Sequence, residues 1–76
     1  MQSSDLEFPA FAAAANHAQI RWALFAHPDV RDVLLTLHSD TLRVLHSGPV
    51  DADAWSATLT AAGFPPPQIG AVRQAA

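Results

Sequence analysis

The spacing of hydrophobic residues predicts a first strand near the start of the chain. Residues 5–11 alternate, with Leu6, Phe8 and Ala10 on one side, and a two-residue period is typical of a strand. Pro9 favours a sheet edge for this segment, because proline has no N–H to donate to a neighbouring strand.

The next segment, residues 13–26, has the period of an amphipathic helix. It begins with alanine, the best helix former. Asn16, Ile20 and Leu24 then follow at intervals of four, which places them on one face. We expect the helix to end before Pro28, since the residue ahead of a proline avoids helical angles.

Residues 30–47 alternate in two runs and predict a β-hairpin. Ser39 and Asp40 lie between the runs and are expected to form a two-residue turn. The expected pairs are Leu37 with Leu42, Leu35 with Val44 and Val33 with His46 on one face, and His38 with Thr41, Thr36 with Arg43 and Leu34 with Leu45 on the other.

A second helix is predicted over residues 51–62. Asp51 is suited to the N-cap, because its carboxylate can accept a hydrogen bond from a free backbone N–H. Gly63 fits the left-handed position after the helix, and Phe64 is then expected to fold back on Leu59.

Three prolines follow, and a last strand is expected at 68–73. The order strand, helix, strand, strand, helix, strand predicts an α+β, ferredoxin-like fold. With right-handed crossovers it has a four-stranded antiparallel sheet and both helices on one face. We expect a single domain over 1–76, with its core at about 5–73. This fold supports many activities and identifies none.

Composition narrows the function classes. The 76 residues include no cysteine and no lysine, four arginines and a net charge of −3. Nucleic-acid binding depends on clustered cations, so we expect no nucleic-acid partner. No apolar run is long enough to cross a membrane, and the N-terminus lacks the charge and apolar stretch of a signal peptide. We therefore expect a cytoplasmic protein without membrane insertion.

The segment spacing resembles the heavy-metal-associated domain family, which includes copper chaperones. Ile20, Leu24 and the turn Pro28-Asp29-Val30 keep the family's first helix and turn. Residues 51–64, DADAWSATLTAAGF, resemble its second helix and the glycine and aromatic residue that end it. The resemblance covers about residues 6 to 73 and implies a ferredoxin-like fold and a metal-handling ancestry.

The metal motif of that family is absent. Its two cysteines correspond to Ala13 and Asn16, and its methionine corresponds to Phe11. Alanine has no donor atom, and an amide oxygen is a hard ligand, whereas Cu(I) prefers sulfur. The resemblance therefore does not imply a copper site.

The histidines offer an alternative metal site. His17 and His38 are expected at the same end of the sheet, where Asp40 could assist them in binding Zn, Ni or Cu(II) weakly. Two ligands are too few for a structural zinc site, which needs four. We therefore expect no cofactor, unless a dimer shares such a site. His27 is expected to cap the first helix, and His46 to be a hydrogen-bonded core residue.

A protein-binding surface is the leading hypothesis. Trp22 and Phe25 lie three apart on the first helix, rotated away from its buried stripe, unless that stripe is wide enough to include Trp22. Leu34 and Leu45 are expected on the open face of the sheet. Contiguous apolar patches indicate contacts, and aromatic residues are common anchors. With Phe64, Trp22 and Phe25 are the predicted partner-binding residues.

No candidate catalytic site is convincing. Asp51 and Asp53 stand at a helix start, where cap and dipole roles explain them. His38, Ser39 and Asp40 are neighbours on one turn, without a sequence for an oxyanion hole. We expect a non-enzyme that acts through a protein partner or self-association and is linked to metal homeostasis by ancestry. The alternative is a weak divalent-metal carrier.

Overall fold

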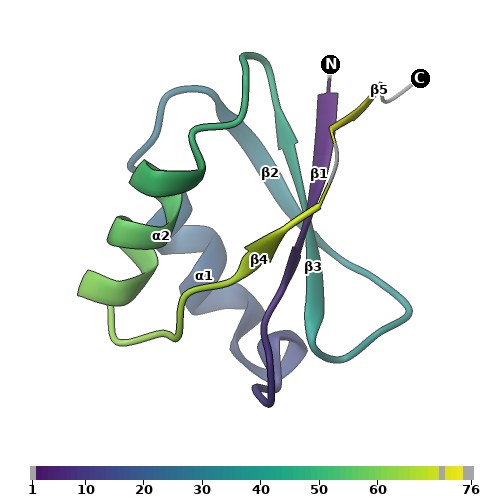
Figure 1. Cartoon of the computed structure of the whole chain (residues 1–76), viewed down its shortest axis with the longest axis vertical. Helices are drawn as coiled ribbons and strands as arrows, with labels where there is room; N and C mark the ends of the chain where they lie inside the picture. The colour runs from purple at the N-terminus through teal and green to yellow at the C-terminus, as the bar shows by residue number, and fades with distance from the viewer. Residues whose placement is uncertain (1, 71, 75–76) are drawn as a thin grey trace.

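The strands form one antiparallel sheet, and both helices pack on the same side of it (Figure 1). The computed structural model describes residues 2–70 and 72–74. The sheet has the order β2-β3-β1-β4, and β5 also pairs with β1. This confirms the predicted α+β fold. The elements are β1 (Gln2–Glu7), the 3-10 helix η1 (Ala13–Asn16), α1 (His17–Leu24), β2 (Val30–Leu35), β3 (Thr41–His46), α2 (Ala52–Ala61), β4 (Gln68–Ile69) and β5 (Arg73–Gln74).

The core lies between the sheet and the two helices. The longer strands β1, β2 and β3 and both α-helices contribute residues from the face that their period places inward, which is how a sheet and helices bury their apolar sides. The fully or nearly buried apolar residues are Leu6, Phe8, Ala13, Ile20, Leu24, Val30, Val33, Leu42, Val44, Trp55 and Leu59. Neither described helix is long or apolar enough to span a membrane.

β1 begins and ends earlier than the predicted strand at 5–11. Its ladder with β3 stops at Glu7, although Phe8 is still fully buried. Pro9 and Ala10 form a turn, and Ala10 has a φ of 54°, in the left-handed region. The chain therefore leaves the sheet at the proline, instead of continuing along an edge.

The first helix is shorter than the predicted 13–26. Its first four residues form η1, in which the Ala15 N–H donates to the Ala12 carbonyl at 3.2 Å. The α-helical part ends at Leu24. Beyond it the chain forms two tight turns, in which the Ala26 N–H donates to the Ala23 carbonyl and the His27 N–H donates to the Leu24 carbonyl. Tight turns at both ends of a helix are common and replace part of the predicted α-helix.

Both predicted caps of α2 are confirmed. The Asp51 carboxylate accepts from the Ala54 N–H at 3.2 Å. At the other end Gly63 has a φ of 94°, and its N–H donates to Thr60. The Phe64 N–H then donates to the Leu59 carbonyl at 2.9 Å, which completes a Schellman motif.

The register of the hairpin differs from the prediction by two residues. The observed pairs are Leu35 with Leu42, Leu34 with Arg43, Val33 with Val44, Asp32 with Leu45 and Val30 with His46. The loop is therefore longer than the two-residue Ser39-Asp40 turn that we predicted. From Val33 to Leu35 a shift of two residues leaves the side chains on their predicted faces, so the alternating pattern alone could not exclude it. Leu37 falls in the loop and is fully exposed, and the irregularity between Val30 and Asp32 changes the alternation at the start of β2.

The longer loop is held by its own polar groups and by its neighbours. The Thr36 hydroxyl donates to the Thr41 carbonyl at 2.9 Å. The Ser39 carbonyl accepts from the Ala14 N–H, and the Asp40 carbonyl accepts from the Phe8 N–H, both at 2.8 Å. The loop is thereby joined to the start of η1 and to the end of β1.

The open face of the sheet is less apolar than predicted. Leu34 pairs with Arg43 instead of Leu45, because the register is different. The Arg43 guanidinium forms an ion pair with Asp5, with 2.9 Å between Nε and Oδ1. The prediction that Leu34 pairs with Leu45 on this face was therefore wrong.

The last strand, predicted at 68–73, is present as the two short strands β4 and β5. Both pair antiparallel with β1. Between them, the Gly70 N–H donates to the Asp5 carbonyl at 2.9 Å. Residue 71 of the predicted strand lies outside the described residues.

Candidate functional site

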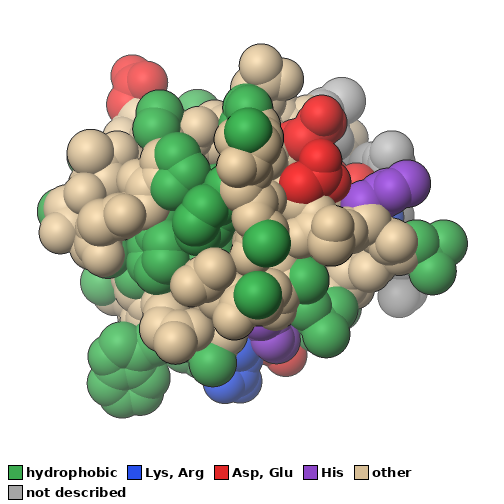
Figure 2. Space-filling model, turned by 90° about the horizontal axis from the view of Figure 1, so that it is seen from below, with side chains coloured by type: hydrophobic (Ala, Val, Ile, Leu, Met, Phe, Trp, Pro, Cys, Tyr) green, Lys and Arg blue, Asp and Glu red, His purple; other side chains and the backbone are tan. Residues whose placement is uncertain are grey.

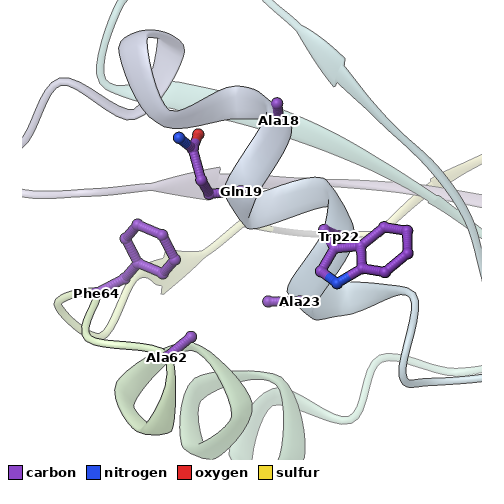
Figure 3. Close-up of a pocket in the computed structure, with 6 residues that line it drawn as sticks. All are labelled: Ala18, Gln19, Trp22, Ala23, Ala62 and Phe64. Atoms are coloured by element: carbon purple, nitrogen blue, oxygen red, sulfur yellow. The ribbon is translucent and has the colours of Figure 1, made fainter.

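A hollow of about 440 Å³ lies where α1 meets the C-terminal end of α2 (Figure 3). Its lining consists of Ala18, Gln19, Trp22, Ala23, Ala62 and Phe64. Three of these are alanines, and their short side chains leave space where longer ones would fill the groove between the helices. None of the six carries a charge.

Trp22 stands at the edge of this hollow and is largely exposed. Its side chain is 81% accessible, and it projects away from Phe64 in Figure 3. A second hollow, of about 300 Å³, is lined by Trp22, Phe25 and Ala26. Trp22 therefore separates two depressions on one apolar surface. The alternative that Trp22 packs into a wide helix stripe is wrong.

Phe25 is partly covered by one charged neighbour. The Arg21 guanidinium carbon lies 4.7 Å from the centre of the Phe25 ring, in a cation–π contact. Arg21 also donates from Nε to Asp32 at 2.8 Å. This bond and the Val33 N–H lower the pKa of Asp32 below the ordinary aspartate value. Arg21, the charged residue in contact with Phe25, is therefore already paired.

Phe64 is held firmly at the opposite wall. Its backbone is fixed by the Schellman motif, and its ring lies edge-on to Phe11, with 6.0 Å between centroids. Phe11 in turn lies 5.7 Å from the Phe8 ring, which is fully buried. The three rings connect the wall of the hollow to the core. On the face seen from below, a group of hydrophobic side chains lies in the left half, and others are scattered across the rest of the face (Figure 2).

Ala13 and Asn16, where the resemblance would place the family's cysteines, have structural contacts. Ala13 is fully buried and belongs to the core. The Asn16 side-chain amide donates to the Ala12 carbonyl at 3.1 Å.

His17 and His38 are in different environments. His17 is half-buried, and its Nε2 lies 2.5 Å from the Val33 carbonyl. A carbonyl only accepts, so Nε2 carries the proton and only Nδ1 could bind a metal. His38 is exposed on the hairpin loop. The described residues contain no group of three or more His, Cys, Asp or Glu that could hold a metal ion.

The other two histidines bridge elements of the fold. His27 follows α1, and its Nε2 lies 2.7 Å from the Thr58 hydroxyl of α2. The His27 side chain therefore connects the end of α1 to α2. The expected role as a cap of the first helix did not include this contact with Thr58. His46 is fully buried, as expected, with Ser4 and Gly48 as hydrogen-bond partners.

Residues that could have suggested chemistry have structural roles or lie apart from the hollow. Asp51 caps α2, and Asp53 is exposed in its first turn. Ser39 and Asp40 use their backbone carbonyls to join the hairpin loop to neighbouring segments.

Of the predicted partner-binding residues, the structure places Trp22 and Phe64 around one hollow, with Phe25 beside the second. Sequence reasoning did not find the hollow itself. Its signal is the presence of Ala18, Ala23 and Ala62, which are small residues on two helices that meet. The sequence pattern places Ala23 and Ala62 on the buried stripes of their helices, and it does not show that the two helices meet at these residues. Neither family models, nor curated proteins, nor solved structures match this chain.

Proposed function

We propose that this chain is a non-catalytic protein-interaction module that receives a hydrophobic group of a partner in the α1–α2 hollow. The observation that carries the proposal is Trp22, an 81% exposed tryptophan beside an uncharged hollow of about 440 Å³. Large exposed apolar patches are uncommon on monomers and often indicate contact sites. Tryptophan is also enriched among residues that dominate binding energy.

The rigidity of the walls supports the same conclusion. Phe64 is anchored to the core by two ring contacts, and Ala18 and Ala23 lie on one regular helix. A site that is formed before binding loses less conformational entropy when a partner docks.

Descent from heavy-metal-associated domains is part of the proposal. The observed strand order is compatible with it, and the residues at the family's ligand positions now pack the core or bond to the backbone. On this view the old metal loop became a structural element, and contact with proteins remained. A link to metal homeostasis and a cytoplasmic location follow from the ancestry and stay predictions.

The test is site-specific cross-linking followed by binding with purified components. A photoreactive amino acid at Gln19 faces the hollow, and the same group at Leu37, which is fully exposed on the hairpin loop, is the matched control. We expect one dominant adduct from position 19, to another protein or to a second copy of the chain. We expect position 37 to give a different, weaker set.

The captured protein is then purified and its affinity measured by calorimetry. We expect Trp22→Ala to weaken binding at least tenfold and Leu37→Ala to leave it unchanged. Binding that is insensitive to Trp22, or the same adducts from both positions, would show that the hollow is not the contact site.

A further inference from the structure

We propose that the occupant of the hollow is Trp22 of a second copy, so that two chains form a symmetric dimer through their α1 helices. This inference rests on the proposed function, because it identifies the partner of that site. In a two-fold contact the same patch is used on both chains, so a patch must hold both the projecting group and its receptor.

The α1 surface meets this requirement. Trp22 projects from the helix, and Ala18 and Ala23 open the hollow beside it on the same helix (Figure 3). A volume of about 440 Å³ is within the range of small-ligand pockets, roughly 300–1,000 Å³. It is sufficient for one indole ring. A two-fold axis near Trp22 would place each ring in the other chain's hollow.

The charges on this surface permit contact with a copy of the same chain. The net charge of −3 makes two copies repel each other, so a self-contact needs a patch without unpaired charges. The six lining residues are neutral. Arg21, the adjacent charged residue on α1, is paired with Asp32 and covers Phe25. The contact would therefore bury no unpaired charge from the six lining residues or from Arg21.

The size of the surface sets the expected strength. α1 has eight residues and is about 12 Å long, and a buried tryptophan contributes roughly 150–250 Å². The total is therefore at the low end of interfaces, below about 1,200 Å². Interfaces of this size include weak, transient contacts, so we expect a dimer that dissociates at low micromolar concentration.

The edge of the sheet is the rival dimer surface. β2 is an edge strand, and Leu35 beside the loop is 57% exposed. However, the ladder is irregular between Val30 and Asp32, and Arg31 is exposed there. Irregularities and charges are features by which edge strands avoid pairing with other chains. This favours the helix surface.

The first experiment is sedimentation equilibrium of the full chain from 1 to 500 µM. We expect a monomer–dimer equilibrium in the wild type, at least tenfold weakened by Trp22→Ala and unchanged by Leu37→Ala. Trp22 is exposed, so its replacement should leave the fold intact, and circular dichroism checks this.

A complementation experiment tests the exchange of side chains directly. Ala18→Glu keeps the tryptophan but puts a charge in the hollow, whereas Trp22→Ala keeps the hollow but lacks the tryptophan. We expect both variants to self-associate at least tenfold more weakly than the wild type. When unlabelled Ala18→Glu is added to ¹⁵N-labelled Trp22→Ala, we expect the amide signals of Ala62 and Phe64 to shift.

The outcomes separate this inference from the proposed function. If dimerisation needs Trp22 and the two variants complement each other, both the proposed function and the second copy as occupant are supported. A chain that stays monomeric to 500 µM overturns the second copy as occupant, while a Trp22-dependent adduct to another protein from position 19 would still support the hollow as a binding site. A dimer that survives Trp22→Ala but is lost on Leu35→Lys would place the contact on β2 and overturn the inference.

Discussion

The buried pair Ser4 and His46 gives a prediction about the stability of the fold. His46 Nδ1 lies 2.6 Å from the Gly48 carbonyl, and Nε2 lies 2.9 Å from the Ser4 hydroxyl. Because a carbonyl only accepts, Nδ1 carries the proton. In the neutral ring Nε2 is then the acceptor, and Ser4 donates to it. Both hydrogen bonds are needed to satisfy the imidazole, which is fully buried and lies edge-on to Trp55.

Replacing Ser4 by alanine removes the donor and leaves Nε2 buried without a partner. Ser4 is 1% exposed, so water does not readily replace it. An unsatisfied buried polar group costs about 1–3 kcal/mol. In a domain of this size each kcal/mol lowers the Tm by roughly 4–8 °C. We therefore expect a decrease of at least about 4 °C in Ser4→Ala.

Thermal unfolding followed by circular dichroism measures this change. Ser39→Ala is the control, because Ser39 is exposed and contributes its backbone carbonyl, which the substitution keeps. We expect its effect to stay within about 0.5 kcal/mol. Long-range ¹H–¹⁵N NMR should show the proton of His46 on Nδ1. Equal Tm values for the two variants, or a proton on Nε2 in the neutral ring, would refute the assigned hydrogen bonds.

Three further predictions concern local stability. Asp51→Ala removes the N-cap of α2 and should cost about 0.5–2 kcal/mol in urea unfolding, more than Asp53→Ala, which lacks the cap bond. Gly63→Ala should cost about 1–2 kcal/mol by the same assay from its φ of 94° alone, because the added Cβ meets nothing within 4 Å. The pKa of Asp32 is lowered by the hydrogen bond from Arg21. The stabilisation of the folded state by the ionised Asp32 is therefore present above the ordinary aspartate pKa of about 3.9 and is lost as the pH falls below that value. The side chains of Arg21 and Asp32 are both over a third exposed. This ion pair should therefore change the free energy of unfolding in urea by less than about 1 kcal/mol between pH 6 and pH 3. Asp32→Asn should remove that change.

The sequence pattern was sufficient for the order of elements and most of the core. Local chemistry decides these features: Asp51 and Gly63 define the two ends of α2 without help from distant residues. The inward positions of β3 follow from simple alternation and end in His46, which is buried as predicted.

The features that were predicted wrongly depend on contacts between distant segments. The hairpin register is fixed where the Ser39 and Asp40 carbonyls meet Ala14 and Phe8, which no local pattern reveals. β1 begins at polar residues because β3 and β5 provide partners there, and His46 satisfies Ser4. The hollow likewise exists only because small residues of two separate helices meet.

The two tryptophans allow folding and docking to be observed separately in one sample. Trp55 is 2% exposed in the core, whereas Trp22 is 81% exposed beside the hollow. Acrylamide should therefore quench the Trp22 emission strongly and the Trp55 emission little. If Trp22 enters the hollow of a second chain, the quenched fraction should fall as the protein concentration rises from 1 to 500 µM. The Trp22→Phe variant, which keeps only Trp55, should show no such change. A dimer by sedimentation with constant quenching would mean that the chains meet elsewhere, because a buried indole cannot remain equally accessible to the quencher.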